Sequence, residues 1–174
     1  MNTVINIENY PDCCQMVSDA PFWVKDKKHE TAVICDNTDY DVEVRHAENE
    51  VAFLPIDGCV YPSGGSEKRC DFAVAGKNQT FFVEVKEIER FNDHKKKSAK
   101  RVEAKEQLSQ TINFFKAEHQ DLDLKKSFAF IALLPKLKDE PRGIIQTKQG
   151  ANIDKFLEMC GCPNIYEGNL IEIN

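Results

Sequence analysis

Two β-prone segments joined by a short polar turn constrain the fold of this 174-residue chain more than any other feature. Segments 69–75 and 80–86 flank residues 76–79, Gly-Lys-Asn-Gln, which we interpret as the turn of a hairpin. With the two middle residues of the turn at its tip, residues whose numbers sum to 155 stand opposite each other. This register predicts that Asp71 lies directly opposite Glu84.

The same register divides the hairpin into two faces. Asp71 and Glu84 share one face, and Lys86 joins them because it lies two residues beyond Glu84. Opposed residues have Cβ atoms about 4.5–5.5 Å apart, so we expect these three side chains to lie together. The other face is apolar and is expected to be buried; it consists of Cys70, Phe72, Val74, Phe81, Val83 and Val85.

The polar face of the hairpin has the composition of a metal site. Two carboxylates held side by side repel each other unless a cation lies between them, and Mg2+ and Mn2+ accept carboxylate oxygens. Asp71 and Glu84 therefore predict a divalent metal ion that binds a scissile phosphate and activates water, with Lys86 orienting the nucleophile or neutralising transition-state charge. The alternative is an ordinary solvent-exposed face in which Lys86 pairs with Glu84.

The pattern resembles the signature of the PD-(D/E)XK nuclease superfamily, the restriction-endonuclease-like fold. Its members carry an acid that opens one strand and a Glu-x-Lys element on the next. Asp71 matches the first acid, Glu84-Val85-Lys86 matches the second element, and Cys70 occupies the place of the proline. Over about residues 50–134 the resemblance implies an α/β nuclease fold, Mg2+ or Mn2+ as cofactor, and hydrolysis of phosphodiester bonds, with DNA as the expected substrate.

The elements after the hairpin extend this resemblance. Segment 95–117 is predicted to be one long amphipathic helix, because apolar residues recur every three or four positions; they are Ala104, Leu108, Ile112 and Phe115. Segment 127–134 is continuously apolar and indicates a buried central strand. The superfamily has a helix and then a strand in this order. Some members carry a glutamine on the helix near the site, which Gln107 matches; the alternative is a polar residue bordering the apolar stripe.

The remaining segments predict a single domain over residues 1–174, built around one mixed sheet. Strands over 51–56 and 59–61 form an antiparallel meander with the hairpin. A short helix and a final strand are expected over 153–160 and 170–173. Before residue 50 we expect no helix beyond a turn; the predicted elements there are a strand over 4–7, a helical turn over 12–18, and a hairpin formed by 31–35 and 40–45.

A third acid is needed to complete a typical metal site, and Asp57 is the first choice. It precedes Asp71 by one strand and one turn. Asp57-Gly58 is also a strong turn signal, so a turn residue is the equal alternative. Glu48 and Glu50 are further candidates, each more consistent with a solvated charge.

Charge is distributed unevenly along the chain. The net charge is −6, which argues against nonspecific binding of nucleic acid, but segment 86–105 holds eight basic and four acidic residues. Within it, Lys97, Arg101 and Lys105 recur every four residues and line one helical face, which suits contacts to a phosphate backbone. The alternative is a solvated helix start. We find no motif that reads base edges.

Cysteine content and apolar runs bear on the compartment. The chain has seven cysteines and begins without a basic segment followed by an apolar one. No run approaches the roughly 18 apolar residues of a membrane helix. These features predict a cytoplasmic protein with free thiols and no membrane partner. Zinc is not expected, because no paired Cys-x2–4-Cys knuckles occur.

Two other functions remain open at this stage. The first is a catalytically inactive nuclease-fold protein that acts as a binding, immunity or regulatory partner, which the acidic net charge favours. The second is a nuclease subunit that needs a homodimer or another protein to bind DNA, because one basic helix on an acidic chain is a small contact surface.

Overall fold

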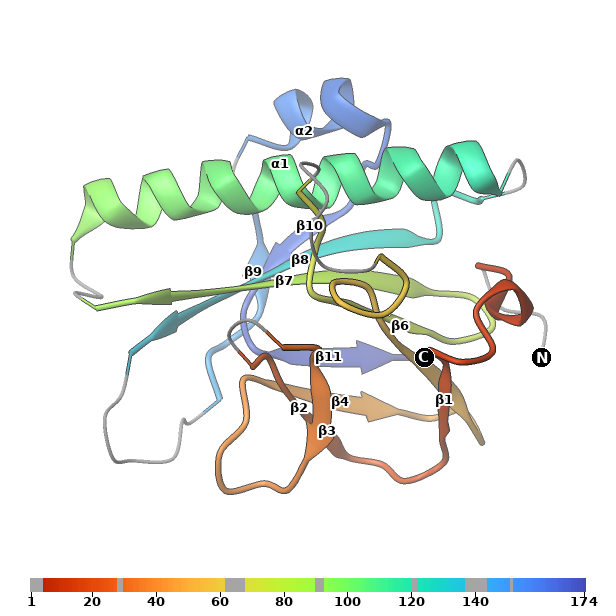
Figure 1. Cartoon of the computed structure of the whole chain (residues 1–174). Coiled ribbons are helices and arrows are strands. Elements are labelled where there is room, and N and C mark those ends of the chain that lie inside the picture. Colours follow the sequence, from red (N-terminus) through yellow and green to blue (C-terminus); the bar gives the residue numbers. More distant parts are fainter. Residues whose placement is uncertain are drawn as a thin grey trace.

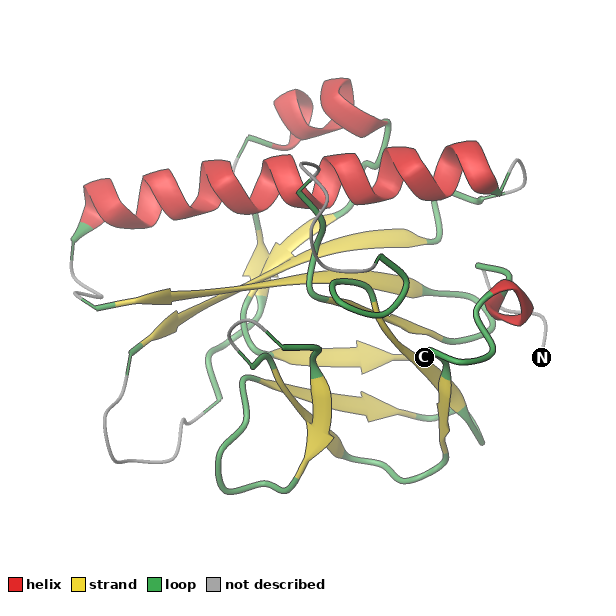
Figure 2. Cartoon of the chain, in the orientation of Figure 1, coloured by secondary structure: helices red, strands yellow, loops and turns green. Residues whose placement is uncertain are grey.

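The computed structural model has a mixed α/β architecture in three layers (Figure 1). It describes residues 5–27, 30–61, 68–89, 93–119, 122–136, 144–150 and 152–174. In these residues, helices α1 (His94–Glu118) and α2 (Ile153–Cys160) lie on one face of a seven-stranded sheet. A four-stranded sheet packs against the other face (Figure 2).

The seven-stranded sheet contains the predicted meander. Its strands are β1 (Gln15–Val17), β5 (Val51–Pro55), β6 (Phe72–Ala75), β7 (Thr80–Ile88), β8 (Ser127–Pro135), β10 (Ile165–Glu167) and β9 (Lys148–Gln149), in that spatial order. Strands β5, β6 and β7 are antiparallel neighbours, whereas β8 runs parallel to β7 on its other side. The meander is confirmed for the strands over 51–56, 69–75 and 80–86 but not for 59–61, and the buried strand after the helix is confirmed.

The four-stranded sheet corrects two predictions. Its order is β11 (Leu170–Ile173), β4 (Val42–His46), β2 (Phe22–Lys25) and β3 (Val33–Cys35). The expected hairpin over 31–45 is wrong, because β2 lies between β3 and β4 and pairs antiparallel with both. The single mixed sheet is also wrong, because β11 pairs in parallel with β4 and not with the larger sheet.

The larger sheet is buried on both faces, whereas the hairpin was predicted to bury only its apolar face. Phe82 and its neighbours on the helix side pack with Leu108 and Phe115 of α1. Phe72 and Val83 pack on the opposite side against the smaller sheet. The expected apolar face is confirmed except for its first residue: Cys70 is buried with the helix-side core.

Helix α1 extends one residue beyond the predicted range at each end. The Asp93 carboxylate accepts hydrogen bonds from the amides of Lys95 and Lys96, at 3.0 and 3.1 Å, and so satisfies the first turn. The predicted apolar stripe of α1 is fully buried. Helix α2 has the predicted bounds and ends at Gly161, whose φ of 77° favours glycine. No helix in the described residues is long and apolar enough to cross a membrane.

The N-terminal region differs most from expectation. Residues Ile7–Asn9 form a 3-10 turn, η1, in place of the end of the strand predicted over 4–7, whose first residue lies outside the described residues. Strand β1 occupies three of the seven residues of the helical turn predicted over 12–18, and residues 12 and 13 form a turn before it. Segment 59–61 forms no strand and contributes only a bridge between Tyr61 and Asp57.

A disulfide joins Cys13 to Cys59 and corrects the expectation that all cysteines are free thiols. It connects the segment before β1 to the loop after β5. The other five cysteines are free, and Cys70, Cys160 and Cys162 among them are buried.

Candidate active site

The candidate site lies where β7 extends beyond its neighbour β6. Strand β7 pairs with β8 from Thr80 to Ile88 but pairs with β6 only as far as Val83. The paired residues follow the predicted register, with Phe72 opposite Val83 and the other pairs in step. Beyond Val83, the edge of β7 that faces β6 has no strand partner in the described residues.

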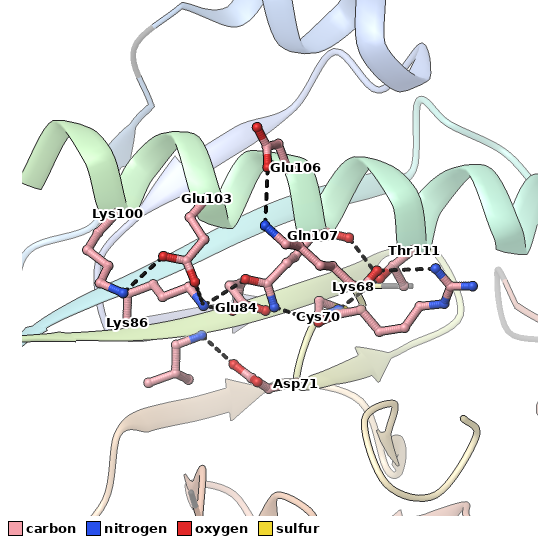
Figure 3. Close-up of polar contacts among 12 residues, drawn as sticks. Lys68, Cys70, Asp71, Glu84, Lys86, Lys100, Glu103, Glu106, Gln107 and Thr111 are labelled. Carbon is pink, nitrogen blue, oxygen red and sulfur yellow. Dashed lines mark hydrogen bonds and ion pairs between the residues drawn. The ribbon is translucent and has the colours of Figure 1, made fainter. Parts of the chain in front are cut away.

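Asp71 lies directly before β6 and covers this edge. Its Oδ2 accepts a hydrogen bond of 2.6 Å from the Val85 amide (Figure 3). Its carbonyl accepts hydrogen bonds from the amides of Ile56 and Asp57, at 2.9 and 3.3 Å. Burial raises the pKa of the Asp71 carboxyl well above its usual value, and the carboxyls of Glu84 and Asp26 raise it further.

Glu84 is a buried acid with too few partners. Its side chain is only 1% exposed, and Lys86 Nζ lies 2.5 Å from its Oε1. Apart from this ion pair, neither carboxylate oxygen has a hydrogen-bond partner among the described residues. Burial raises the pKa of Glu84 to about 8, even though Lys86 acts in the opposite direction.

Lys86 connects the strand to the helix. Its Nζ donates a hydrogen bond of 2.7 Å to Gln107 Oε1 and forms an ion pair of 3.2 Å with Glu103 Oε1 (Figure 3). The Gln107 amide nitrogen donates to the carbonyl of Arg69 at 2.9 Å, so Gln107 is fixed at both ends of its amide. Burial alone would lower the pKa of Lys86, but Glu84 and Glu103 outweigh it and raise the pKa above its usual value.

The structure therefore brings together the sequence-predicted residues Asp71, Glu84, Lys86 and Gln107. Glu103, which the sequence interpretation did not include, also belongs to the site because it forms an ion pair with Lys86. Its signal was present in the sequence, because it lies four residues before Gln107 and so shares a helical face with it.

Asp26 is the acid that the sequence interpretation missed. It follows β2 directly and lines the same cavity as Asp71 and Glu84. Its carboxylate raises the pKa of both of these residues. Burial, then Asp57, raises the pKa of Asp26 itself. The sequence did contain a signal for Asp26: residues 22–26, Phe-Trp-Val-Lys-Asp, are typical of a short strand that ends in an acid.

Asp57 lies beside the site without lining the cavity. Its side chain is exposed, and it is followed by Gly58, whose φ is +82°. A Cβ on Gly58 would lie 2.7 Å from Thr31 Oγ1, so both the conformation and the space favour glycine. This geometry is that of a turn residue. Glu48 accepts hydrogen bonds from the Lys77 amide at the hairpin turn, and Glu50 is exposed.

A cavity of about 660 Å³ is lined by the acids Asp26, Asp71 and Glu84 and by Lys86 and Gln107. Asp26 and Lys25 line it from the smaller sheet, Glu84 and Lys86 from β7, and Lys100 from α1. The volume is typical of a small-ligand site. The cavity thus opens beside the carboxylates of Asp26, Asp71 and Glu84, although the Glu84 oxygens themselves are buried.

The donor set suits a hard divalent cation, although the site is not preassembled. In the described residues, no three His, Cys, Asp or Glu side chains come close enough to hold a metal ion. The Asp71 carboxylate is directed at the Val85 amide and that of Glu84 at Lys86. Carboxylate oxygens are nevertheless the ligands that Mg2+ and Mn2+ prefer, and those of Glu84 have no hydrogen-bond donor among the described residues apart from Lys86. Asp26, Asp71 and Glu84 are thus three ligand candidates around one cavity.

The predicted basic stripe of α1 is not part of this cavity. Arg101 Nε lies 2.7 Å from Glu167 Oε1 on β10, on the other flank of the helix. Burial lowers the pKa of Lys105, and Glu167 is among the charges that act on it. Neither these two residues nor Lys97 lines the cavity, whereas Lys100 does.

No family model, curated protein or solved structure matches the chain. The resemblance to the PD-(D/E)XK superfamily therefore depends on Asp71, on Glu84 and Lys86 two residues apart, and on the order of the helix and strand that follow.

Proposed function

We propose that this protein is a divalent-metal-dependent nuclease of the restriction-endonuclease-like type, which hydrolyses phosphodiester bonds, with DNA as its expected substrate. The observation that carries the proposal is Glu84: a buried acid that has no hydrogen-bond donor among the described residues apart from the ammonium of Lys86, beside a second acid and next to a cavity. Such an arrangement costs stability, and a bound cation would relieve it.

In this proposal Asp71 and Glu84 are metal ligands, and Asp26 replaces Asp57 as the third acid. Bound Mg2+ or Mn2+ would polarise the scissile phosphate and lower the pKa of a water molecule. The three carboxylates come from β2, β6 and β7 or the residues next to them. Their convergence would give a role to Asp26, which follows β2 of the smaller sheet and lines the same cavity as Glu84 of β7.

Lys86 is assigned the role of a fixed positive charge. Because its pKa is raised, it stays protonated near neutral pH and is a poor general base. A protonated amine beside the phosphate stabilises the negative charge that develops in the transition state. Gln107 is a positioning residue, because it accepts from Lys86 Nζ and is itself tied to the Arg69 carbonyl.

A second cavity suggests where the substrate continues. It measures about 510 Å³ and shares Glu87 and Lys100 with the first. Lys96, Lys100 and Lys136 line it. We assign phosphate contacts to Lys96 and Lys100, in place of the Arg101 side of α1.

The test is cleavage of plasmid and single-stranded DNA in Mg2+, in Mn2+ and in EDTA, alongside melting curves. Wild type should cut only with metal and should melt higher with metal than in EDTA. Glu84→Gln should lose both effects. Lys86→Ala should keep the metal-induced increase in melting temperature and lose cleavage.

The rival function is a catalytically inactive binding partner. It is favoured by one observation: the Lys86 ammonium already neutralises Glu84 at 2.5 Å, as a metal ion would. If wild type cuts no nucleic acid and its melting temperature does not respond to Mg2+ or Mn2+, the nuclease proposal is wrong and this function replaces it.

A further inference from the structure

Lys86 has more partners than its own strand supplies. Glu84 lies at 2.5 Å on β7, while Gln107 and Glu103 reach the same nitrogen from α1 at 2.7 and 3.2 Å. An ammonium group has three N–H donors. Three acceptors around Lys86 Nζ therefore match its donor capacity, with one acceptor on the strand and two on the helix.

We propose that Glu103 is a positioning residue that keeps the Lys86 ammonium at the site when a divalent cation binds Glu84. This inference rests on the proposed function, because it concerns the metal-bound state. A divalent cation and an ammonium group compete for Glu84, since like charges repel at short range. Once Glu84 is occupied, Glu103 is the other carboxylate among the described residues that forms an ion pair with Lys86 Nζ.

The environment of Glu103 suits this role. Its side chain is 37% exposed, so it stays hydrated and adjusts its position more readily than Glu84. Its second oxygen is 2.9 Å from Lys100 Nζ, one helical turn earlier. Lys86 and Lys100 thus approach different oxygens of one carboxylate, which holds Glu103 on the cavity side of α1.

An ordinary surface ion pair is the competing explanation. Glu103 and Lys100 are spaced i,i+3, and such pairs stabilise helices slightly on their own. In that case the effect of Glu103 would not depend on Lys86. A purely electrostatic effect on the cation would also be independent of Lys86. The two explanations are therefore separated by a double-mutant cycle.

The experiment measures Mn2+ affinity by calorimetry for wild type, Glu103→Gln, Lys86→Met and the double variant. Glu103→Gln should weaken Mn2+ binding about tenfold in wild type, within the usual range of coupling between sites. It should have less than about a twofold effect in the Lys86→Met background, where no ammonium needs a new partner. Glu106→Gln is the matched control, because Glu106 lies on the same helix and pairs with Lys68; it should leave Mn2+ affinity unchanged.

Equal effects of Glu103→Gln in both backgrounds would overturn the inference and leave the proposed function intact. An unchanged Mn2+ affinity on introducing Glu103→Gln into wild type would also overturn the inference and leave the proposed function intact. Absence of Mn2+ binding to wild type would instead overturn the proposed function, and the inference with it.

A second measurement avoids the Lys86→Met variant should it fold poorly. The 15N NMR signal of Lys86 Nζ reports whether the ammonium is held. On saturation with Mg2+, the signal should persist in wild type and broaden in Glu103→Gln. Persistence in both proteins would contradict the positioning role.

Discussion

Two buried glutamates form ion pairs on opposite flanks of α1, and their surroundings differ. Glu84 on β7 is 1% exposed and lies 2.5 Å from Lys86. Glu167 on β10 is 7% exposed and lies 2.7 Å from Arg101. As isolated pairs they are nearly alike in burial and distance.

The difference lies in the second ring of charges, by which we mean the charged side chains that surround each ion pair without belonging to it. Around Glu167, the basic residue Lys105 adds to Arg101. Around Glu84, the acids Asp26 and Glu103 both raise its pKa. Additional cations stabilise a buried acid as a structural contact, whereas additional acids around a buried acid cost stability, which a bound cation would relieve. The comparison teaches that the second ring of charges, and not the ion pair itself, distinguishes a candidate site from a structural bridge.

The largest effect that would test this contrast is on cleavage. Glu84→Gln should reduce cleavage about 10³-fold or more, because it removes a proposed metal ligand. Its metal-free unfolding free energy should be equal to or greater than that of wild type, since buried like charges are reduced. Glu167→Gln should leave cleavage intact and lower the unfolding free energy by about 1–2 kcal/mol, because Arg101 loses a charged partner. Plasmid cleavage and urea denaturation in EDTA measure the two quantities.

The contrast fails if the two variants behave alike. Loss of cleavage in Glu167→Gln would place the second flank in the site. Strong destabilisation of metal-free Glu84→Gln would show that Glu84 is a structural acid.

The hairpin and α1 could be predicted from the sequence because local rules determine them. A short turn fixes which residues oppose each other, so the register from Phe72 opposite Val83 to Ala75 opposite Thr80 was predicted correctly from the numbering, although Asp71 itself lies just outside the paired strands. The buried stripe of α1 follows from a period of 3.6 residues. Gln107 was placed near the site by the resemblance to the superfamily and not by a local rule, and the structure brings its amide oxygen to 2.7 Å from Lys86 Nζ.

The smaller sheet could not be predicted in the same way. Its order depends on β2 inserting between two strands that follow it in sequence, and on β11 joining from the end of the described chain. These are long-range pairings that local patterns do not encode. Asp26 was missed for this reason, since only the pairing of β2 brings it to the edge of β7.

The basic residues of α1 show a related limit of prediction from sequence periodicity. Periodicity correctly places Lys97, Arg101 and Lys105 on one face of a helix, but it cannot say which flank faces the site. That depends on the direction in which α1 crosses the sheet. The structure places Lys100 and Glu103 on the cavity flank, one or two residues away from the predicted stripe in sequence.

A second, smaller effect concerns pH. The pKa of Glu84 is about 8 in the folded protein against a usual value of 4.5, so between these values the folded chain binds a proton that the unfolded chain does not. The unfolding free energy of metal-free wild type should therefore fall as pH rises through this range. Glu84→Gln lacks this dependence, so its advantage over wild type should grow by on the order of 2 kcal/mol from pH 5.5 to 7.5.

Urea denaturation at several pH values in EDTA measures this difference. Saturating Mg2+ should flatten the wild-type dependence, because a bound cation favours the ionised carboxylate. A gap between the two proteins that stays constant with pH would mean that Glu84 is ionised in the folded protein, contrary to the excess of acid around it.

The smallest expected effect compares the lysines of the two flanks in nucleic-acid binding. Lys96 lines the second cavity, whereas burial lowers the pKa of Lys105 and Glu167 is close enough to act on it. In the non-cleaving Glu84→Gln background, Lys96→Gln should weaken binding of a single-stranded oligonucleotide about threefold and reduce the salt dependence by about 0.7 in the log–log slope, as expected for one lost phosphate contact. Lys105→Gln should change neither quantity by a measurable amount. Fluorescence anisotropy across a salt titration provides both numbers for both variants. If Lys105→Gln reduces the slope and Lys96→Gln does not, the strand runs along the Arg101 flank, and the basic stripe read from the sequence is the true phosphate contact.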